Sequence, residues 1–361
     1  MRFECKSCEK AYNIPDEKLP AKREISFPCP NCKALIHLVL KAAASPEAAA
    51  AGDTAAGTGQ GAAENGEIET AELKRRVLLK LKDLPPMPQI VFKARQLIGD
   101  PDSEMKELAT LLESDQGIAA KVLRLANSAY YGLSGTVSSI RHASALLGYK
   151  TLGELITIAA TSKLMGKVLK GYGLSAEDSW EHSLAVATGS KILALRRRPE
   201  LENDAFAAGL IHDAGKLILE PYVLDRIERF EAYTDGGRRS MLSAEQKILG
   251  FDHAEIGHEV CNHWKIPDAI AQAIRHHHQP DRSEGVYLAY IVSLADTIAN
   301  ISKAMREMDD TLAGMDGISG FLYMLDDEIM ETLDMSEEEI PGILEEVNRS
   351  VSRIAEEMKA V

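Results

Sequence analysis

Apolar residues recur at helical spacing through most of the chain after residue 70. Leu73, Val77 and Leu81 share one helix face, and Leu97 and Ile98 belong to the next such segment before Gly99-Asp100-Pro101 interrupts the pattern. Positions repeating every three to four residues are typical of amphipathic helices. Since no strand pattern competes between residues 89 and 170, we predict an all-α fold for the main part of the chain.

The first 40 residues follow a different pattern. Short segments at 10–14, 24–27 and 35–40 have the composition of β-strands. Two Cys-x-x-Cys pairs lie twenty residues apart, a spacing expected for a tetrahedral zinc site, and four thiolates leave no coordination position open for catalysis. The segment resembles the small bacterial zinc-ribbon, in which Zn²⁺ supplies most of the folding energy. Its predicted structural ligands are Cys5, Cys8, Cys29 and Cys32.

The domain plan follows from where periodicity begins and ends. Residues 41–69 are rich in Ala and Gly and lack a period, which is typical of a flexible linker. We therefore expect a zinc-ribbon at 1–40, a linker at 41–69, a large helical domain at 70–300 and a helical extension at 301–361. The last apolar face, beginning after Ser336, must dock on this bundle or on a second chain.

Composition narrows the classes of function. The 361 residues carry a formal net charge of -14, which argues against general binding to nucleic-acid backbone. The chain has no run of about 18 apolar residues, and its first residues do not resemble a signal peptide, so we expect a cytoplasmic protein without a membrane span. In a reducing compartment, the paired cysteines favour metal binding over disulfides.

The most informative stretch is residues 205–219, an apolar run predicted to be one helix. Asp213 lies between Ile211 and Leu217, and a buried carboxylate is costly unless it is paired or bound to a metal. The adjacent His212 could approach the same metal from another side. The glycines in this run would let other helices come close, and Lys216 could meet an anion.

Eight of the ten histidines fall between residues 182 and 278. His182 on its own could be a packed core residue, and the run 276–278 could be cations stabilised by a helix C-terminus. His253 follows an N-cap signal, whereas His258 lies five residues further on and off its face. Asp296 sits in a segment that is apolar nearly all round, so it too needs a cation.

Several of these motifs resemble the HDOD domain, the all-helical "HD-related output domain" of bacterial signalling proteins. The similar segments are 84–88 (LPPMP), 123–132 (LRLANSAYYG), 139–140 and 147–148, and the similarity continues to about residue 280. Gln116 departs from the proline that is more usual after the aspartate. The resemblance implies an HD-like bundle of helices.

The order of histidines and aspartates is also similar to the HD phosphohydrolase superfamily, closest to its HD-GYP branch. That resemblance implies two metals, often iron or manganese, bridged by Asp213, with Lys216 contacting a phosphate. Gln279 stands where that branch usually has Glu, and no Gly-Tyr-Pro segment follows. The implied ligands are His182, His212, Asp213, His253, His277, His278 and Asp296.

These observations predict a bacterial signal-transduction protein whose helical domain relays a signal through contacts with protein partners and binds metal. The alternative is a metal-dependent phosphodiesterase acting on a nucleotide such as a cyclic dinucleotide, with Asp213 and Lys216 as catalytic residues. The sequence also leaves open that the histidines and aspartates are a polar cluster that only orders a regulatory scaffold. A homodimer is left open as well. A nucleic-acid regulator acting through the ribbon is disfavoured by the charge.

Overall fold

The computed structural model describes the helical part of the chain and the strands before it. The described residues are 2–4, 11–13, 24–28, 35–39, 60–84, 89–100, 102–128, 131, 136–307, 321–322 and 324–359. The four cysteines of the predicted zinc site and residues 41–59 of the predicted linker lie outside this set.

The N-terminal strands form two antiparallel pairs. Strand β1 (Arg2–Glu4) pairs with β2 (Ala11–Asn13), and β3 (Glu24–Pro28) pairs with β4 (Leu35–Val39). The second to fourth strands lie where the sequence pattern places them. Strand β1 was not predicted, because three residues are too few to show an alternating pattern.

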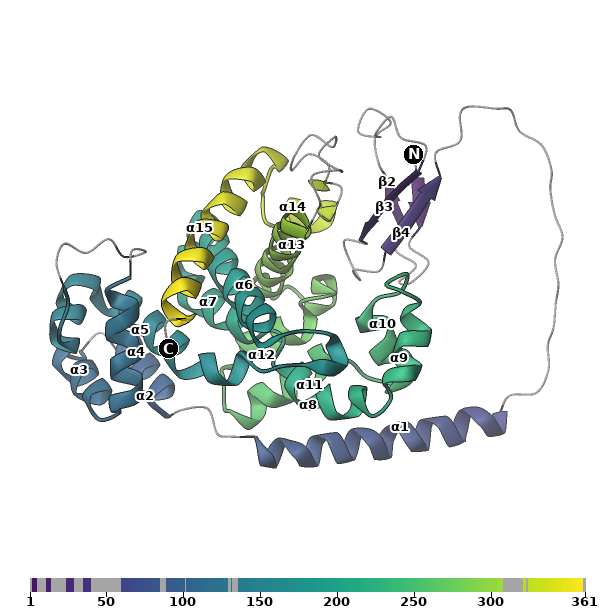
Figure 1. The fold of residues 1–361 in the computed structure, drawn as a ribbon, viewed down its shortest axis with the longest axis horizontal. Coiled ribbons are helices and arrows are strands. Elements are labelled where there is room, and N and C mark those ends of the chain that lie inside the picture. Colours follow the sequence, from purple (N-terminus) through teal and green to yellow (C-terminus); the bar gives the residue numbers. More distant parts are fainter. Residues whose placement is uncertain are drawn as a thin grey trace.

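Helix α1 (Gln60–Lys80) starts ten residues before the predicted helix start at Thr70, inside the segment expected to be a linker. Its face formed by Leu73 and Val77 is buried, and the single-turn helix η2 (Leu81–Asp83) continues it. Figure 1 shows α1 running along one side of the bundle. Lys74 forms a 2.6 Å ion pair with Glu255, so part of the basic run at 74–76 is neutralised.

Four helices form what we call the N-terminal lobe, at one end of the molecule in Figure 1. They are α2 (Gln89–Gly99), α3 (Met105–Glu113), α4 (Gln116–Ala126) and α5 (Ile140–Met165). Helix α5 breaks at Gly148, whose φ of 76° lies in the left-handed region that glycine tolerates best. Gly148 belongs to the segment 147–148 that resembles the HDOD domain.

Asn127 fastens the end of α4 to Val137. Its side-chain amide donates to the carbonyls of Leu123 and Val137 at 2.8 Å, and its Oδ1 accepts from the Val137 N–H at 2.7 Å. Because the side-chain amide bonds both the N–H and the carbonyl of Val137, it links the end of α4 to the backbone at residue 137. This residue of the Asn-Ser-Ala-Tyr-Tyr-Gly motif thus has a structural role.

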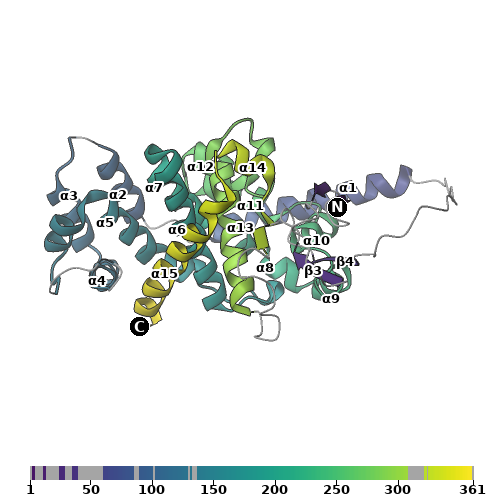
Figure 2. The same cartoon turned by 90° about the horizontal axis from the view of Figure 1, so that it is seen from above.

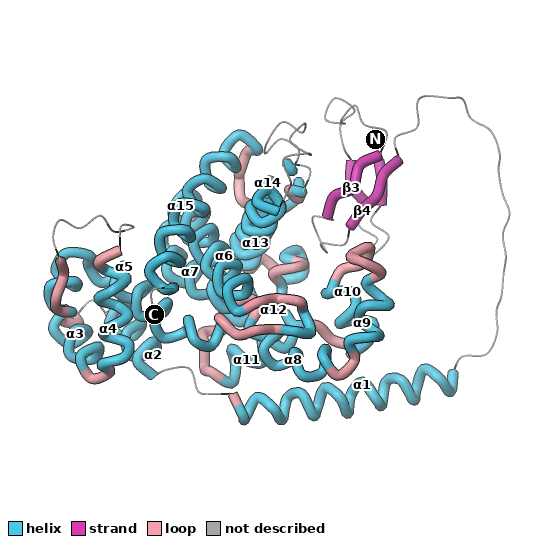
Figure 3. The backbone as a smooth tube through the Cα atoms, in the orientation of Figure 1, coloured by secondary structure: helices cyan, strands magenta, loops and turns pink. Residues whose placement is uncertain are grey.

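The second group, the C-terminal lobe, comprises the described helices between residues 170 and 359 (Figure 3). It contains most of the buried apolar residues. Helix α6 packs against α7, α13 and α15, and α11 packs against α8 and α12. The elements are η3 (Lys170–Tyr172), α6 (Ala176–Arg197), η4 (Pro199–Leu201), α7 (Glu202–Ile211), α8 (Ala214–Leu224), α9 (Ile227–Thr234), α10 (Met241–Ile248), α11 (His253–His263), α12 (Asp268–His276), η5 (Pro280–Ser283), α13 (Tyr287–Glu307), α14 (Asp327–Thr332), η8 (Glu337–Glu339) and α15 (Ile340–Lys359).

The last helix docks on its own bundle. Ile343, Val347 and Val351 of α15 are buried, and the helix packs on α6 and α13 and reaches α4 of the N-terminal lobe. Figure 2 shows the C-terminal end of α15 directed toward the N-terminal lobe. Just before α15, Glu339 of η8 forms a 2.6 Å ion pair with Arg197 of α6. The all-α prediction for the main domain is confirmed, and no described helix is long and apolar enough to cross a membrane.

Candidate metal centre

The His212-Asp213 pair lies at a junction between two helices. Helix α7 ends at Ile211 and α8 starts at Ala214, so the prediction of one continuous helix over 205–219 is wrong. Asp213 has φ −93° and ψ 10°, outside the helical range. The break turns the two neighbouring side chains toward the interior at the point where the two helices meet.

Close backbone approaches bring the other helices to this junction. A Cβ on Gly209 would lie 2.6 Å from the Val186 carbonyl of α6, and one on Gly215 would lie 1.9 Å from the His253 carbonyl of α11. Only glycine permits such contacts. Helix α6 carries His182, so the two glycines set the positions of helices that bear predicted ligands.

The first group of predicted ligands comprises His182, His212 and Asp213, with ligand atoms within 4.8 Å of one another. Asp213 Oδ2 lies 3.8 Å from His182 Nε2 and 3.4 Å from His212 Nε2. Asp296, buried on α13, has Oδ1 3.4 Å from His182 Nε2. Imidazole and carboxylate donors of this kind suit divalent transition metals.

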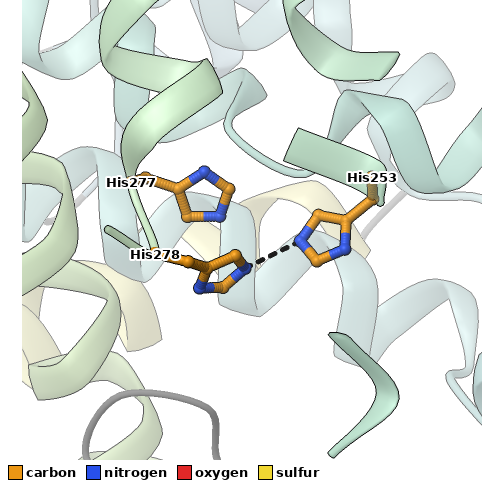
Figure 4. A group of neighbouring side chains, drawn as sticks. All are labelled: His253, His277 and His278. Carbon is orange, nitrogen blue, oxygen red and sulfur yellow. Dashed lines mark hydrogen bonds between the residues drawn. The ribbon is translucent and has the colours of Figure 1, made fainter. Parts of the chain in front are cut away.

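The second group comprises His253, His277 and His278, again with ligand atoms within 4.8 Å. His253 is the first residue of α11, and the two others directly follow α12, which ends at His276. Figure 4 shows His277 and His278 on one side and His253 on the other, with Nε2 of His278 and Nε2 of His253 2.9 Å apart. His253 Nε2 is also 3.3 Å from Oδ1 of Asp213.

The orientation of the imidazole rings leaves their Nε2 atoms available. His212 Nδ1 donates to the Gly209 carbonyl at 2.8 Å, and His277 Nδ1 donates to the Ile274 carbonyl at 2.6 Å. Fixing one ring nitrogen in this way presents the other as a metal ligand. His277 Nε2 is buried and has no hydrogen-bond partner among the described residues, which a bound cation would supply.

Burial and neighbouring charges strongly shift the pKa values of groups in the site. Burial opposes ionisation of Asp213, but Lys216 and His212 more than offset it, so the pKa of the carboxyl lies well below its usual range. The Lys216 Nζ is 2.6 Å from Asp213 Oδ2. Burial and the neighbouring His212 and His253 lower the pKa of His277 to about 3, which keeps that ring neutral and able to bind metal.

Three further side chains support the site and were missed from the sequence. Glu245 on α10 contacts His253, Tyr172 contacts Glu245, and Asn300 donates to Asp296 Oδ1 at 2.6 Å. Asn300 could have been found, since it lies one helical turn after Asp296. The other two come from separate elements, and no local pattern connects them to the histidines.

The remaining histidines of the cluster serve elsewhere. His258 is buried next to Asn262 and Glu259, and neither it nor His276 belongs to either metal-ligating group among the described residues. This agrees with the sequence, in which His258 lies five residues after His253 and on another face of the helix. Cys261 is fully buried, and burial raises the pKa of its thiol to about 12, as expected for a residue that packs rather than reacts.

The HDOD domain model matches residues 84–280, more than half of the chain. The chain belongs to the HDOD family. A zinc-ribbon domain model matches residues 1–37, which confirms the N-terminal module recognised from its cysteines. The HDOD match covers the predicted ligands of the helical domain except Asp296, which lies 16 residues beyond the end of the match.

Solved structures share this fold. An HDOD domain protein of unknown function from Geobacter sulfurreducens is 26% identical, with a TM-score of 0.59, and the match covers 81% of this chain and 97% of that one. A candidate phosphohydrolase from Shewanella amazonensis is 24% identical, with a TM-score of 0.60 and coverage of 78% and 97%. An uncharacterized protein from Treponema pallidum is 23% identical over 255 residues, which are 67% of this chain and 46% of that relative.

Proposed function

We propose that this HDOD protein is a regulatory protein that relays a signal through protein contacts and binds two divalent transition metals, iron or manganese, in its helical domain. The observation that carries the metal proposal is the position of Asp213. Its Oδ2 faces His182 and His212, whereas its Oδ1 faces His253. One carboxylate therefore lies between two groups of histidines, as a bridging ligand would.

The donor atoms fit such a pair. Two ligand atoms that each lie about 2.1 Å from one ion, at near right angles, are about 3 Å apart. Separations of 2.9, 3.3 and 3.4 Å in the site are close to this value. Bound metal would compensate the buried carboxylates of Asp213 and Asp296 and would supply Lewis acidity at the same place.

The signalling proposal rests on architecture and relatives. Helix α1, which follows the ribbon in the chain, packs against α8, and Lys74 pairs with Glu255 of α11, the helix that carries His253. The helix that follows the ribbon in the chain is thus packed against two helices next to the candidate metal site. A candidate signal transduction protein from Marinobacter aquaeolei shares the fold at 21% identity with a TM-score of 0.60, over 81% of this chain and 66% of that one.

Phosphoester hydrolysis is a second candidate, favoured by the position of Lys216. The Lys216 and His182 side chains keep 18% and 21% of their surface exposed, whereas His212 and His253 are nearly inaccessible. The site therefore opens to solvent on the side of Lys216 and His182. There the Lys216 ammonium could bind and orient a phosphate, while Asp213 and the histidines hold the ions.

The test compares metal content in three full-length proteins: wild type, Asp213→Asn and a control variant. Asp213→Asn removes the shared carboxylate and leaves the cysteines of the ribbon intact, so the difference in metal content reports on the helical site alone. We expect wild-type protein reconstituted with Mn²⁺ to retain two equivalents more than the variant. Asp225→Asn, a change at an exposed carboxylate, is the matched control. Equal content in all three proteins would refute the proposal.

A further inference from the structure

Glu245 is a fully buried carboxylate whose contacts converge on His253. Its Oε2 accepts from the His253 backbone N–H at 2.8 Å and from the His253 ring Nδ1 at 2.7 Å. Its Oε1 accepts from the Tyr172 hydroxyl at 2.7 Å. A buried carboxylate needs such partners, and here two of the three come from one candidate metal ligand.

Tyr172 is held in place by a strap at residues 166–175. The strap is closed by backbone hydrogen bonds between Leu169 and Leu174. The Gly171 N–H donates to both carboxylate oxygens of Glu220 on α8, at 3.0 and 3.1 Å. The Lys216 ammonium lies 5.8 Å from the centroid of the Tyr172 ring and 2.6 Å from Asp213 Oδ2, so the strap also borders the site next to Asp213.

We propose that Glu245 and Tyr172 are positioning residues that fix His253 as a ligand of the second metal, a proposal that rests on the proposed metal pair. With Nδ1 held by Glu245, Nε2 of His253 points toward His278 and Asp213. A carboxylate on Nδ1 also makes Nε2 a stronger donor. His212 and His277 have only backbone carbonyls at the same position.

The inference makes the two metal positions unequal. The Glu245 contact acts on the group His253, His277 and His278, while Asn300 supports Asp296 beside His182. Weakening the contact between Glu245 and His253 should therefore release the ion of that group and leave the other ion bound. A merely structural role for Glu245, such as satisfying the first N–H of α11, predicts no such selectivity.

The experiment titrates full-length protein, with its ribbon zinc in place, with Mn²⁺ and follows binding by calorimetry. Glu245→Gln keeps an acceptor for His253 but removes the charge, and Tyr172→Phe removes one hydrogen bond from Glu245. We expect Glu245→Gln to lower the affinity for one Mn²⁺ about 10- to 100-fold and to leave the affinity for the other unchanged. Tyr172→Phe should show a smaller effect in the same direction.

Asp252→Ala is the matched control. Asp252 caps the same end of α11 by accepting from the Glu255 N–H at 2.9 Å, and no hydrogen bond or ion pair joins it to His253 among the described contacts. We expect it to cost stability and spare both Mn²⁺ affinities. The positioning role is refuted if Asp252→Ala and Glu245→Gln lower the affinity for Mn²⁺ equally. It is also refuted if Glu245→Gln leaves both affinities unchanged.

A second readout separates this inference from the proposed function. Two-bond ¹H–¹⁵N spectra of the metal-free protein, recorded at a pH at which the spectrum shows His253 to be neutral, report which of its ring nitrogens carries the proton. We expect the proton on Nδ1 in wild-type protein and a mixture of tautomers in Glu245→Gln. Wild-type protein that binds no Mn²⁺ but shows the fixed tautomer would refute the metal pair and keep the positioning role. A tautomer mixture in wild-type protein would refute the positioning role itself.

Discussion

Gly215 lies directly against His253. A Cβ at Gly215 would be 1.9 Å from the His253 carbonyl oxygen and 2.7 Å from the Gly257 nitrogen, so α8 and α11 touch backbone to backbone. This contact places the first residue of α11 beside Asp213, the last residue before α8. The geometry of the candidate metal centre therefore depends on the absence of a side chain at Gly215.

Gly215→Ala should damage both stability and metal binding. The added methyl meets backbone that cannot rotate away, so we expect a loss of about 1–3 kcal/mol in the free energy of unfolding and weaker Mn²⁺ binding. Gly342→Ala is the control, because nothing lies within 4 Å of a Cβ there and alanine favours the helix. Urea unfolding of both variants tests this. A Gly215→Ala protein as stable as wild type would contradict the close contact.

Val77→Ala tests the docking of α1. Val77 is fully buried in the core, whereas Leu79 on the same helix is 46% exposed. We expect Val77→Ala to lower the free energy of unfolding by about 1–3 kcal/mol and Leu79→Ala to change it by no more than about 0.5 kcal/mol. Equal effects in thermal unfolding would mean that α1 does not pack as the structure shows.

The metal-free protein should lose stability as the pH falls below 6.5. His277 has a folded pKa of about 3, so between the two pKa values only the unfolded state takes the proton, and stability falls by up to about 1.4 kcal/mol per pH unit. The pKa of His278 is lowered in the same direction by burial and by His277. His212 and His253 have raised pKa values, so below pH 6.5 they are protonated in both states and add no slope.

His277→Gln should therefore reduce the pH dependence of stability. Urea unfolding at pH 5.0 and 6.5, followed by tryptophan fluorescence, measures it, and both tryptophans, Trp180 and Trp264, lie in the C-terminal lobe. His263→Gln, at an exposed histidine, is the control and should keep the wild-type slope. An unchanged slope in His277→Gln would show that the buried ring is not held neutral.

Lys216→Met separates binding of metal from chemistry on phosphate. The variant removes the 2.6 Å ion pair with Asp213 but none of the predicted ligands, so we expect it to keep both Mn²⁺ ions. If the domain hydrolyses bis(p-nitrophenyl) phosphate, the variant should lose at least about 10²-fold in kcat/KM, the scale of one lost electrostatic contact to the reacting group. Hydrolysis at the wild-type rate would exclude Lys216 from that reaction.

The sequence predicted those parts of the fold that depend on local patterns. The buried all-apolar helix around Asp296, the N-cap at Asp252 and the docked face of α15 are all found in the structure. Each can be inferred from neighbouring residues, because burial and capping repeat at helical spacing. The seven ligands implied by the resemblance to HD phosphohydrolases also lie close together, a proximity that no local pattern of the sequence shows.

The features that were missed depend on contacts between distant elements. The helix break at His212-Asp213 lies next to the packing of Gly215 on His253 of α11, which is 38 residues away in sequence. Glu245 and Tyr172 lie 73 residues apart and meet only in the folded chain. Neither residue carries a local signal, because a buried Glu and an exposed one look the same in a single sequence.

The proposed bridge of Asp213 between two metal ions can be tested by electron paramagnetic resonance of the Mn²⁺-loaded protein. Two ions that share a carboxylate are within a few ångströms and should give the closely spaced hyperfine pattern of an exchange-coupled pair, which Asp213→Asn should abolish. A spectrum of isolated Mn²⁺ ions in wild-type protein, unchanged by Asp213→Asn, would contradict the claim.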